Sequence, residues 1–357
     1  METPTTTELP RLPGLEVPEL QPTQPSGERG RWIERGPSGK LMLFSGRSNP
    51  DLALRIADQL NIELGEVELE TFENGETYCR FRESIRGADV FIVQSCHGKA
   101  TNDHLLELVI MIQAAKLASA NRITAVMPWF PYSRQDKKSS PREPITARLV
   151  ADMVEAAGVD RVLTMDLHAG QIQGFFTIPV DHMTALPQFA QHYRDKGLAG
   201  DEVVCVSPDL GRAKLAGKFG QLLEAEFALM RKTRPAHDVA AVTEVSGRVA
   251  GKTAIMTDDI IVTGGTLIAG AQALKEAGAT EVYACATHGL FPGDAFERIA
   301  ASDLTEVAVT DTVPIDPTKQ PANVRVLTVS GILAETIHNV FSDESVSGIF
   351  PGGNQLF

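Results

Sequence analysis

The sequence predicts an α/β protein made of two similar units, each a mainly parallel β-sheet flanked by helices. The expected strands are short apolar runs without alternation, which is typical of parallel strands buried on both faces. Amphipathic helical segments separate these strands, as βαβ connections require. The alternation restarts after Pro187, and a chain of 357 residues has room for about two domains.

The first unit begins at Leu41. Leu41–Gly46 is the first expected strand, and Asn49 caps the first expected helix, Leu52–Leu60. The chain then alternates between expected strands and helices, in the order Ala88–Gln94, Asp103–Ala118, Arg122–Met127, Ile145–Ala157 and Arg161–Met165.

The second unit repeats this alternation. Its expected strands and helices are, in order, Val203–Ser207, Gly211–Gly220, Thr253–Thr257, Gly265–Ala277 and Glu281–Ala286. Open parallel sheets bind ligands beyond the carboxyl ends of their strands. The residues that directly follow each strand are therefore the candidates for a functional site. Residues 1–37 carry seven prolines and no apolar period, so we expect a disordered tail without a function of its own.

Composition narrows the class of protein. An excess of acidic over basic residues gives a net charge of −13, which argues against non-specific binding to nucleic acid. No two of the four cysteines form a CxxC motif, so neither a zinc knuckle nor a disulfide scaffold is indicated. No apolar run is long enough for a membrane span, and the N-terminus does not resemble a secretory signal. We expect a cytoplasmic protein that binds neither membranes nor nucleic acid.

The strongest candidate site is the segment Thr257–Thr266, in which an expected strand leads into two acids, a loop and a helix. Asp258 and Asp259 stand where carboxylates could hold the vicinal hydroxyls of a ribose. Adjacent glycines allow close approach of the backbone to an anion, and threonines add donors at the helix start: Thr263, Gly264, Gly265 and Thr266. The pattern favours a sugar-phosphate site over a plain turn with surface acids.

His168 lies in a polar, glycine-containing segment just past the strand Arg161–Met165. It could ligate a metal or contact a nucleotide phosphate, although a lone histidine is more often a structural group. The nearby Asp166 favours the functional interpretation.

Charged residues mark two further loops. Arg134 can pair with phosphate through two hydrogen bonds, and the aromatic residues before it, in 128–133, can stack a purine. A solvated basic loop would explain this pattern equally well. Asp209 follows the strand Val203–Ser207 and could bind magnesium through oxygen.

A basic cluster around Lys232 and Arg234 precedes Ala236–Val245, a stretch without a clear period. A mobile loop with these cations could close over a polyphosphate. As a charge run it could also be an ordinary solvated loop.

These motifs together resemble the ribose-phosphate diphosphokinases, or phosphoribosyl-diphosphate synthases, from about Leu41 to Phe350. The segments that carry the resemblance are Phe72–Glu76, Pro131–Asp136, Met165–Phe176, Ser207–Asp209, Lys232–Arg234, Asp258–Asp259 and Glu344–Phe350. The resemblance implies transfer of diphosphate from MgATP to the C1 hydroxyl of ribose 5-phosphate. The products would be phosphoribosyl diphosphate, for nucleotide biosynthesis, and AMP.

The resemblance also implies roles for individual residues. ATP would be bound by Phe72, Asn74 and Glu76, acting on a neighbouring subunit's nucleotide, and by Arg134, Gln135, Asp136 and His168. Ribose 5-phosphate would be bound by Asp258, Asp259, Thr263, Gly264, Gly265 and Thr266. Mg²⁺ would lie at His168 and Asp209, and Lys232 and Arg234 would be the catalytic cations of a flexible loop.

The fold implied by the resemblance consists of two phosphoribosyltransferase-type (type I) domains that face each other. They would span residues 38–185 and 186–341, and the segment 342–357 would pack back on the first domain. The family usually forms hexamers built from dimers, so we expect a homohexamer.

Two positions depart from the family pattern. Val262 stands where the family's ribose-phosphate loop usually carries an aspartate, so the substrate site lacks an acid. Arg212 replaces a glycine that many members have, and an arginine there is compatible with anion binding.

Three functions follow from these observations: an active synthase, a non-catalytic subunit that regulates synthases, and an ordinary phosphoribosyltransferase. Val262 favours the second. The first is favoured by the six retained residues, Lys232, Arg234, His168, Asp209, Asp258 and Asp259. The second α/β unit and the basic loop argue against the third.

Overall fold

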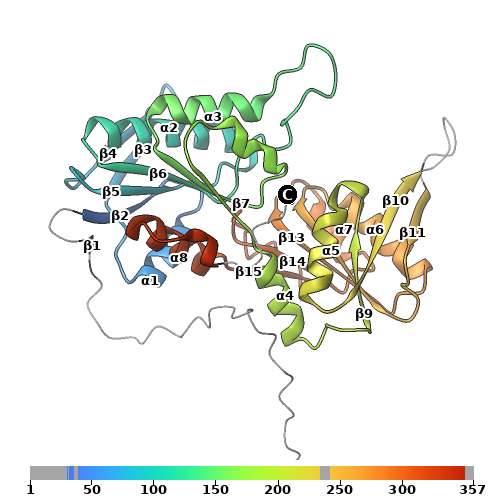
Figure 1. Cartoon of the computed structure of the whole chain (residues 1–357). Helices are drawn as coiled ribbons and strands as arrows, with labels where there is room; N and C mark the ends of the chain where they lie inside the picture. Colours follow the sequence, from blue (N-terminus) through green and yellow to red (C-terminus); the bar gives the residue numbers. More distant parts are fainter. Residues whose placement is uncertain (1–29, 31, 36–38, 234–241, 350–357) are drawn as a thin grey trace, which may run out of the picture.

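The computed structural model describes residues 30, 32–35, 39–233 and 242–349. Two sheets organise the chain, and helices cover both faces of each, as Figure 1 shows. The predicted fold class is therefore confirmed. We call the sheet of the N-terminal part of the chain the first sheet, and the other the second sheet.

The first sheet has six strands in the order β1-β2-β5-β6-β7-β8. All neighbours are parallel except β1 and β2. The strands are β1 Ile33–Arg35, β2 Gly39–Ser45, β5 Asp89–Val93, β6 Arg122–Met127, β7 Arg161–Met165 and β8 Val180–Met183. The helices of this part are α1 Pro50–Leu60, η1 Gly98–Ala100, α2 Thr101–Leu117, α3 Thr146–Ala157 and η2 Gly170–Phe175. A separate antiparallel hairpin consists of β3 Val67–Thr71 and β4 Thr77–Phe81.

The second sheet has seven strands in the order β11-β10-β9-β12-β13-β14-β15, and only β10 and β11 are antiparallel. The strands are β9 Val203–Ser207, β10 Glu226–Thr233, β11 Val242–Ser246, β12 Thr253–Ile261, β13 Glu281–Gly289, β14 Glu306–Thr310 and β15 Val324–Leu327. The helices are α4 Leu186–Asp195, η3 Leu210–Arg212, α5 Ala213–Leu222, α6 Gly265–Glu276, α7 Ala295–Ala300, α8 Ser330–Ser342 and η4 Val346–Ile349.

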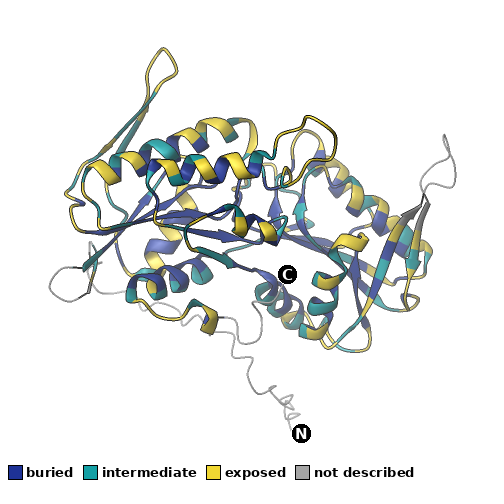
Figure 2. Ribbon diagram, turned by 45° about the horizontal axis from the view of Figure 1, so that its top comes forward, coloured by how far each residue is buried: buried dark blue, intermediate teal, exposed yellow. Residues whose placement is uncertain are grey.

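Helices pack on both faces of each sheet through apolar side chains. The helices α2 and α3 cover one face of the first sheet, and α6 and α7 cover one face of the second. The remaining faces share one large core, to which α1, α4, α5 and α8 contribute. Figure 2 shows the result: strands are dark blue inside, and the outer faces of helices are yellow.

Several segments differ from the sequence prediction, which also left β8, α4, β10, α7, β14, β15, α8 and the short helices unassigned. Ile33–Arg35, inside the expected tail, pair with β2 as a short edge strand. Val242–Ser246, expected to lie in an irregular loop, form β11 because an antiparallel partner, β10, is available. The strand predicted to end at Thr257 continues to Ile261, since β13 pairs with it that far. The hairpin β3–β4 was not predicted.

The carboxyl ends of the two sheets meet each other. The Thr287 Oγ1, at the end of β13, donates to the Asp166 Oδ2, just after β7, at 2.6 Å. Ser95, after β5, donates to the carbonyl oxygen of Thr312, after β14, at 2.6 Å. Because ligands of such sheets bind beyond these ends, both potential binding edges face a single junction, visible in the centre of Figure 1.

The helix α8 returns from the second sheet to the first. It packs against α1, and Asp343, just beyond its end, pairs with Arg122 at 2.6 Å. Ile349 lies in the shared core. The expected domain boundaries at 186 and 342 stay predictions, because the shared core continues across both. Within the part of the chain described above, no helix is long and apolar enough to cross a membrane.

Tyr193→Phe should destabilise the protein by about 1–2 kcal/mol. The Tyr193 side chain is fully buried in the shared core, and its hydroxyl donates to the carbonyl oxygen of Ala284 in β13 at 3.0 Å. Removal of the hydroxyl leaves the Ala284 carbonyl oxygen without this donor in an apolar environment. Urea unfolding followed by circular dichroism measures the change, with Tyr78→Phe on the hairpin as the control. Equal stability of both variants would contradict the expectation.

Candidate active site

A pair of acids lies in β12, near its carboxyl end. Asp259 is buried with 5% of its surface exposed, and Asp258 is half-buried. The backbone N–H of Asp259 donates to the Asp258 Oδ1 at 2.9 Å. The sequence predicted both acids after the strand, whereas the structure places them inside it. The ladder with β13 therefore fixes their backbone.

His168 reaches this pair from the first sheet. Its Nδ1 lies 2.7 Å from the Asp259 Oδ2. An ionised carboxylate only accepts hydrogen bonds, so an N–H at Nδ1 would donate to Asp259 and leave Nε2 as the acceptor of the ring; the same Nδ1 also lies 2.8 Å from the Arg212 Nη2. Ligating histidines commonly have this arrangement, in which a carboxylate fixes the tautomer and the ring orientation. The structure thus brings together two candidates that are 91 residues apart.

Arg212 closes the cluster. Its Nη2 lies 2.8 Å from the Asp259 Oδ2 and donates to the carbonyl oxygen of His168 at 2.9 Å. Its Nε lies 3.6 Å from the Asp258 Oδ1. The sequence analysis noted only that an arginine at position 212 is compatible with anion binding. Nothing in the local pattern indicated that Arg212 would contact these two carboxylates.

The two acids have opposite pKa shifts. Burial and the neighbouring Asp259 carboxylate raise the pKa of Asp258 to about 8. Burial also opposes ionisation of Asp259, but the hydrogen bond from His168 and the charge of Arg212 hold the pKa of Asp259 well below its usual range. Asp259 is therefore the fixed negative charge of the cluster. Its second oxygen, Oδ1, is buried and has no hydrogen-bond partner among the described residues.

The loop after β12 suits an anion. Gly264 has φ 71°, in the left-handed region, and a Cβ there would lie 3.1 Å from the Ile299 Cγ1. Gly265 begins α6, so the first N–H groups of this helix have no partner within it. Thr263 and Thr266 are exposed on either side. The four residues 263–266 have the geometry expected of a phosphate cradle.

Asp209 lies between β9 and η3, three residues before Arg212. It is exposed, and its Oδ1 accepts a hydrogen bond from the backbone N–H of Arg212 at 3.1 Å. No three His, Cys, Asp or Glu side chains gather to form a metal cage within the residues that the structure describes. Mg²⁺ at phosphate sites takes one or two carboxylates and completes its shell with phosphates and water. An exposed carboxylate such as Asp209 and an oriented imidazole such as His168 are the kinds of ligand that such an ion takes.

The loop after β6 only partly meets its prediction. Arg134 and Gln135 are exposed, and the Gln135 Oε1 accepts a hydrogen bond from Thr146 at 2.5 Å, while Asp136 is half-buried. The prediction that the aromatic residues of this loop stack a purine is wrong for Trp129 and Phe130. Both are buried, the first against the His288 ring and the second against Phe176.

Other predicted residues lie away from the cluster. Phe72, Asn74 and Glu76 are exposed on the turn between β3 and β4. Figure 1 shows this hairpin at the outer end of the first sheet, far from the junction. Lys232 is in β10, opposite Thr243 of β11. Arg234 lies outside the described residues.

Supporting residues at the junction were missed by the sequence analysis. His288 is buried, and its Nε2 lies 3.2 Å from the carbonyl oxygens of Met165 and Asp166. His182 accepts the backbone N–H of Leu167 at 2.8 Å, and burial lowers the pKa of His182 to about 4. Both histidines therefore hold the segment that leads to His168. The sequence signal of His288 is a polar residue near the end of an apolar strand, whereas His182 lies in the short, half-polar β8, which the sequence analysis did not predict.

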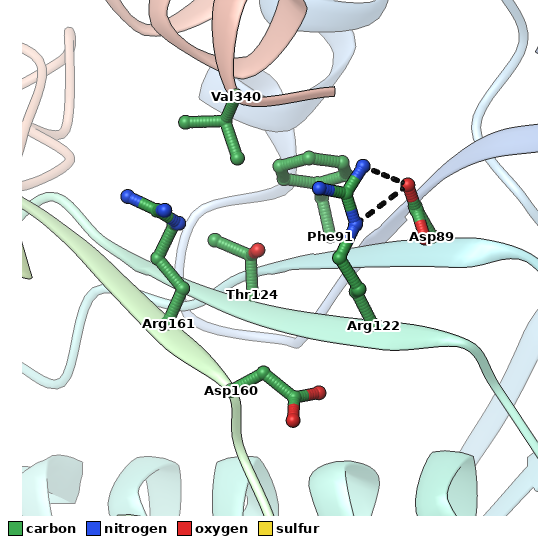
Figure 3. A pocket seen from close by; sticks show the side chains of 7 residues that line it. All are labelled: Asp89, Phe91, Arg122, Thr124, Asp160, Arg161 and Val340. Carbon is green, nitrogen blue, oxygen red and sulfur yellow. Dashed lines mark hydrogen bonds and ion pairs between the residues drawn. The ribbon is translucent and has the colours of Figure 1, made fainter. Parts of the chain in front are cut away.

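A cavity of about 100 Å³ lies at the opposite, amino end of the first sheet. Figure 3 shows its lining, which includes the first residues of β5, β6 and β7: Asp89, Arg122 and Arg161. The Arg122 guanidinium already bonds Asp89, Asp343 and the carbonyl oxygen of Phe341. The cavity is thus part of the anchor of α8 and is separate from the acidic cluster.

Two family models match the chain. Residues 41–158 match the "N-terminal domain of ribose phosphate pyrophosphokinase", and residues 228–351 match the "Phosphoribosyl synthetase-associated domain". The "Ribose-phosphate pyrophosphokinase" of Fusobacterium nucleatum subsp. nucleatum is 46% identical over 310 residues, which covers 87% of this chain and 98% of that protein. The protein of the same description from Caldanaerobacter subterraneus subsp. tengcongensis is 48% identical over 313 residues, with 88% and 98% covered.

A solved structure is also similar. The phosphoribosylpyrophosphate synthetase from Mycobacterium smegmatis superimposes with a TM-score of 0.79 at 44% sequence identity. The match covers 85% of this chain and 99% of that one.

Asp258→Asn should increase the stability of the ligand-free protein as the pH rises to about 8 and above. In the wild type, the folded state keeps a proton on Asp258 up to about pH 8, whereas the unfolded chain releases it near 3.8. Stability therefore falls with increasing pH across this window, by up to about 1.4 kcal/mol per pH unit. The Asp258→Asn variant has no titratable group at this position, so its stability does not fall in this way. Urea unfolding at several pH values measures it, with Asp201→Asn at an exposed position as the control. If the difference in the free energy of unfolding between Asp258→Asn and wild type does not change with pH, the pKa of Asp258 is not raised in the folded state.

Proposed function

This chain belongs to the ribose-phosphate pyrophosphokinase family, and from that premise we propose that it transfers diphosphate from ATP to ribose 5-phosphate. The C1 hydroxyl of the sugar attacks the β-phosphorus of ATP, the bond between the α- and β-phosphates breaks, and AMP leaves. The other product is phosphoribosyl diphosphate. The observation that carries the proposal is the 2.7 Å contact between His168 of the first sheet and Asp259 of the second. It supports a single site to which both sheets contribute.

The ribose 5-phosphate half of the site is proposed at the end of β12. The unpartnered Oδ1 of Asp259 is suited to accept a ribose hydroxyl, since a buried acceptor without a partner is costly until a ligand fills it. Asp258 would accept the neighbouring hydroxyl. Backbone N–H groups and hydroxyls would bind the 5-phosphate: Thr263, Gly264, Gly265 and Thr266.

The ATP half is proposed on the first sheet, with Arg134, Gln135 and Asp136 around the nucleotide and His168 near its phosphates. Phe72, Asn74 and Glu76 lie on a hairpin that points away from the junction, which agrees with a role toward the nucleotide of another subunit. This is the main reason to propose a homo-oligomer, and a hexamer built from dimers stays a prediction, as does a cytoplasmic location.

We propose Mg²⁺ as the cofactor, held by His168 and Asp209 together with phosphate oxygens. It would neutralise charge on the phosphates of ATP. Lys232 and Arg234 would approach the transferred group as further cations, and alignment of the two substrates would supply much of the rate. No general base is assigned, because none of the described residues is oriented for that role by the contacts above.

The test is AMP release from MgATP, measured with and without ribose 5-phosphate. We expect release that depends on ribose 5-phosphate and produces one phosphoribosyl diphosphate for each AMP. An absence of ribose-dependent AMP would rule out the catalytic function and favour a non-catalytic subunit, for which the missing acid at Val262 is the argument.

Lys232→Ala should slow turnover about a thousandfold, as loss of a phosphate-stabilising cation does in related chemistry. Binding of an ATP analogue should stay measurable, because the nucleotide keeps its other contacts. Steady-state assays and calorimetry make the comparison with wild type, and the control is Lys252→Ala, at a lysine just before β12 that pairs with Glu226. An unchanged turnover number would remove Lys232 from the mechanism.

Val262→Asp should alter the KM for ribose 5-phosphate by threefold or more, roughly the effect of one hydrogen bond. The half-buried Val262 lies between Asp259 and the 263–266 loop, so a carboxyl there acts at short range on the sugar site. Initial rates at varied ribose 5-phosphate measure the change. If KM stays the same, this position does not contribute to the site.

A further inference from the structure

Arg212 is held in place from both sides of the junction. Its backbone N–H donates to the Asp209 side chain, which caps η3, and the residue itself precedes α5. Only 17% of its side chain is exposed. The guanidinium therefore has a defined direction, into the space between the sheets, and is not a free surface cation.

The contacts of this guanidinium join the two sheets. Its Nη2 donates to the carbonyl oxygen of His168, in the first sheet's loop, and lies 2.8 Å from the Asp259 Oδ2, in the second sheet. The His168 Nδ1 lies 2.7 Å from the same oxygen and 2.8 Å from the Arg212 Nη2, so the three groups are in mutual contact. The other oxygen, Oδ1, is left without a partner in the described part of the chain.

This asymmetry has a chemical consequence. A carboxylate held at one oxygen by a hydrogen bond and an ion pair cannot rotate without losing both contacts. Its free oxygen is thereby aimed in a constant direction and kept available. The positive charge of Arg212 also pairs with the buried carboxylate, which would otherwise be costly to bury.

We propose that Arg212 is a positioning residue for ribose 5-phosphate, which fixes Asp259 so that its free oxygen accepts a sugar hydroxyl. The inference rests on the proposed function, and it adds a residue to the site. Arg212 acts through Asp259 and does not touch the sugar. Binding of ribose 5-phosphate therefore depends on Arg212, and binding of the nucleotide does not.

The experiment measures two affinities by calorimetry on the full chain with Mg²⁺ present, one for ribose 5-phosphate and one for α,β-methylene-ATP. Arg212→Gln should weaken ribose 5-phosphate binding about 10- to 100-fold, the range of a hydrogen bond to a charged group. The Kd for the ATP analogue should stay within about twofold of wild type. Arg248→Gln is the control, since Arg248 is 83% exposed and pairs only with Glu226 among the described acids.

Two more measurements separate positioning from loss of structure. Arg212→Lys keeps the charge but not the paired donors, so it should recover part of the affinity for ribose 5-phosphate. Arg212→Ala should be rescued in part by millimolar guanidinium ion, which can occupy the space left by the side chain, whereas a misfolded variant would not respond.

Several results would overturn the inference. Equal affinity of wild type and Arg212→Gln for ribose 5-phosphate would do so, and so would parallel losses for both ligands, or the absence of any effect of lysine and guanidinium. Failure of the wild type itself to bind ribose 5-phosphate would instead contradict the proposed function. The two failures are therefore distinguishable.

Discussion

Two carboxyl groups buried side by side need compensating charge, and this requirement governs the junction between the two sheets. The second sheet carries Asp258 and Asp259 and one of their two partners, Arg212, and the first sheet supplies the other, His168. The imidazole of His168 comes from the first sheet, and the guanidinium of Arg212 comes from the loop after β9. The ionised Asp259 is thus stabilised from both sides of the junction, and an unpaired buried charge there would be strongly destabilising.

The rest of the architecture supplies the rigidity that this cluster needs. The large shared core joins helices from both parts of the chain, so the sheets cannot separate without exposing apolar surface. Next to the cluster, Asp166, Thr287 and His288 tie the carboxyl ends of β7 and β13 together through buried hydrogen bonds. Such fixed polar groups are useful in catalysis since they need little reorganisation when charge develops.

Much of the fold could be predicted from local pattern, because buried parallel strands are apolar throughout and glycines mark the anion loop at 263–266. The residues Asp258, Asp259 and His168 were found because they follow or end such strands. Arg212, His182 and His288 were not assigned these roles, since their partners are distant in sequence and only tertiary packing brings them together. For the same reason, strand pairing and not local propensity decided that β12 reaches Ile261 and that Val242–Ser246 is a strand.

The central claim is that His168 and Asp259, although carried by different sheets, act as one unit. A double-mutant cycle tests it most directly, with kcat/KM for AMP formation measured for wild type, His168→Gln, Asp259→Asn and the double variant. Direct contact predicts strong non-additivity, with a coupling energy of at least about 1 kcal/mol. Effects that add to within about 0.5 kcal/mol would show that the two side chains work independently, and would contradict the account.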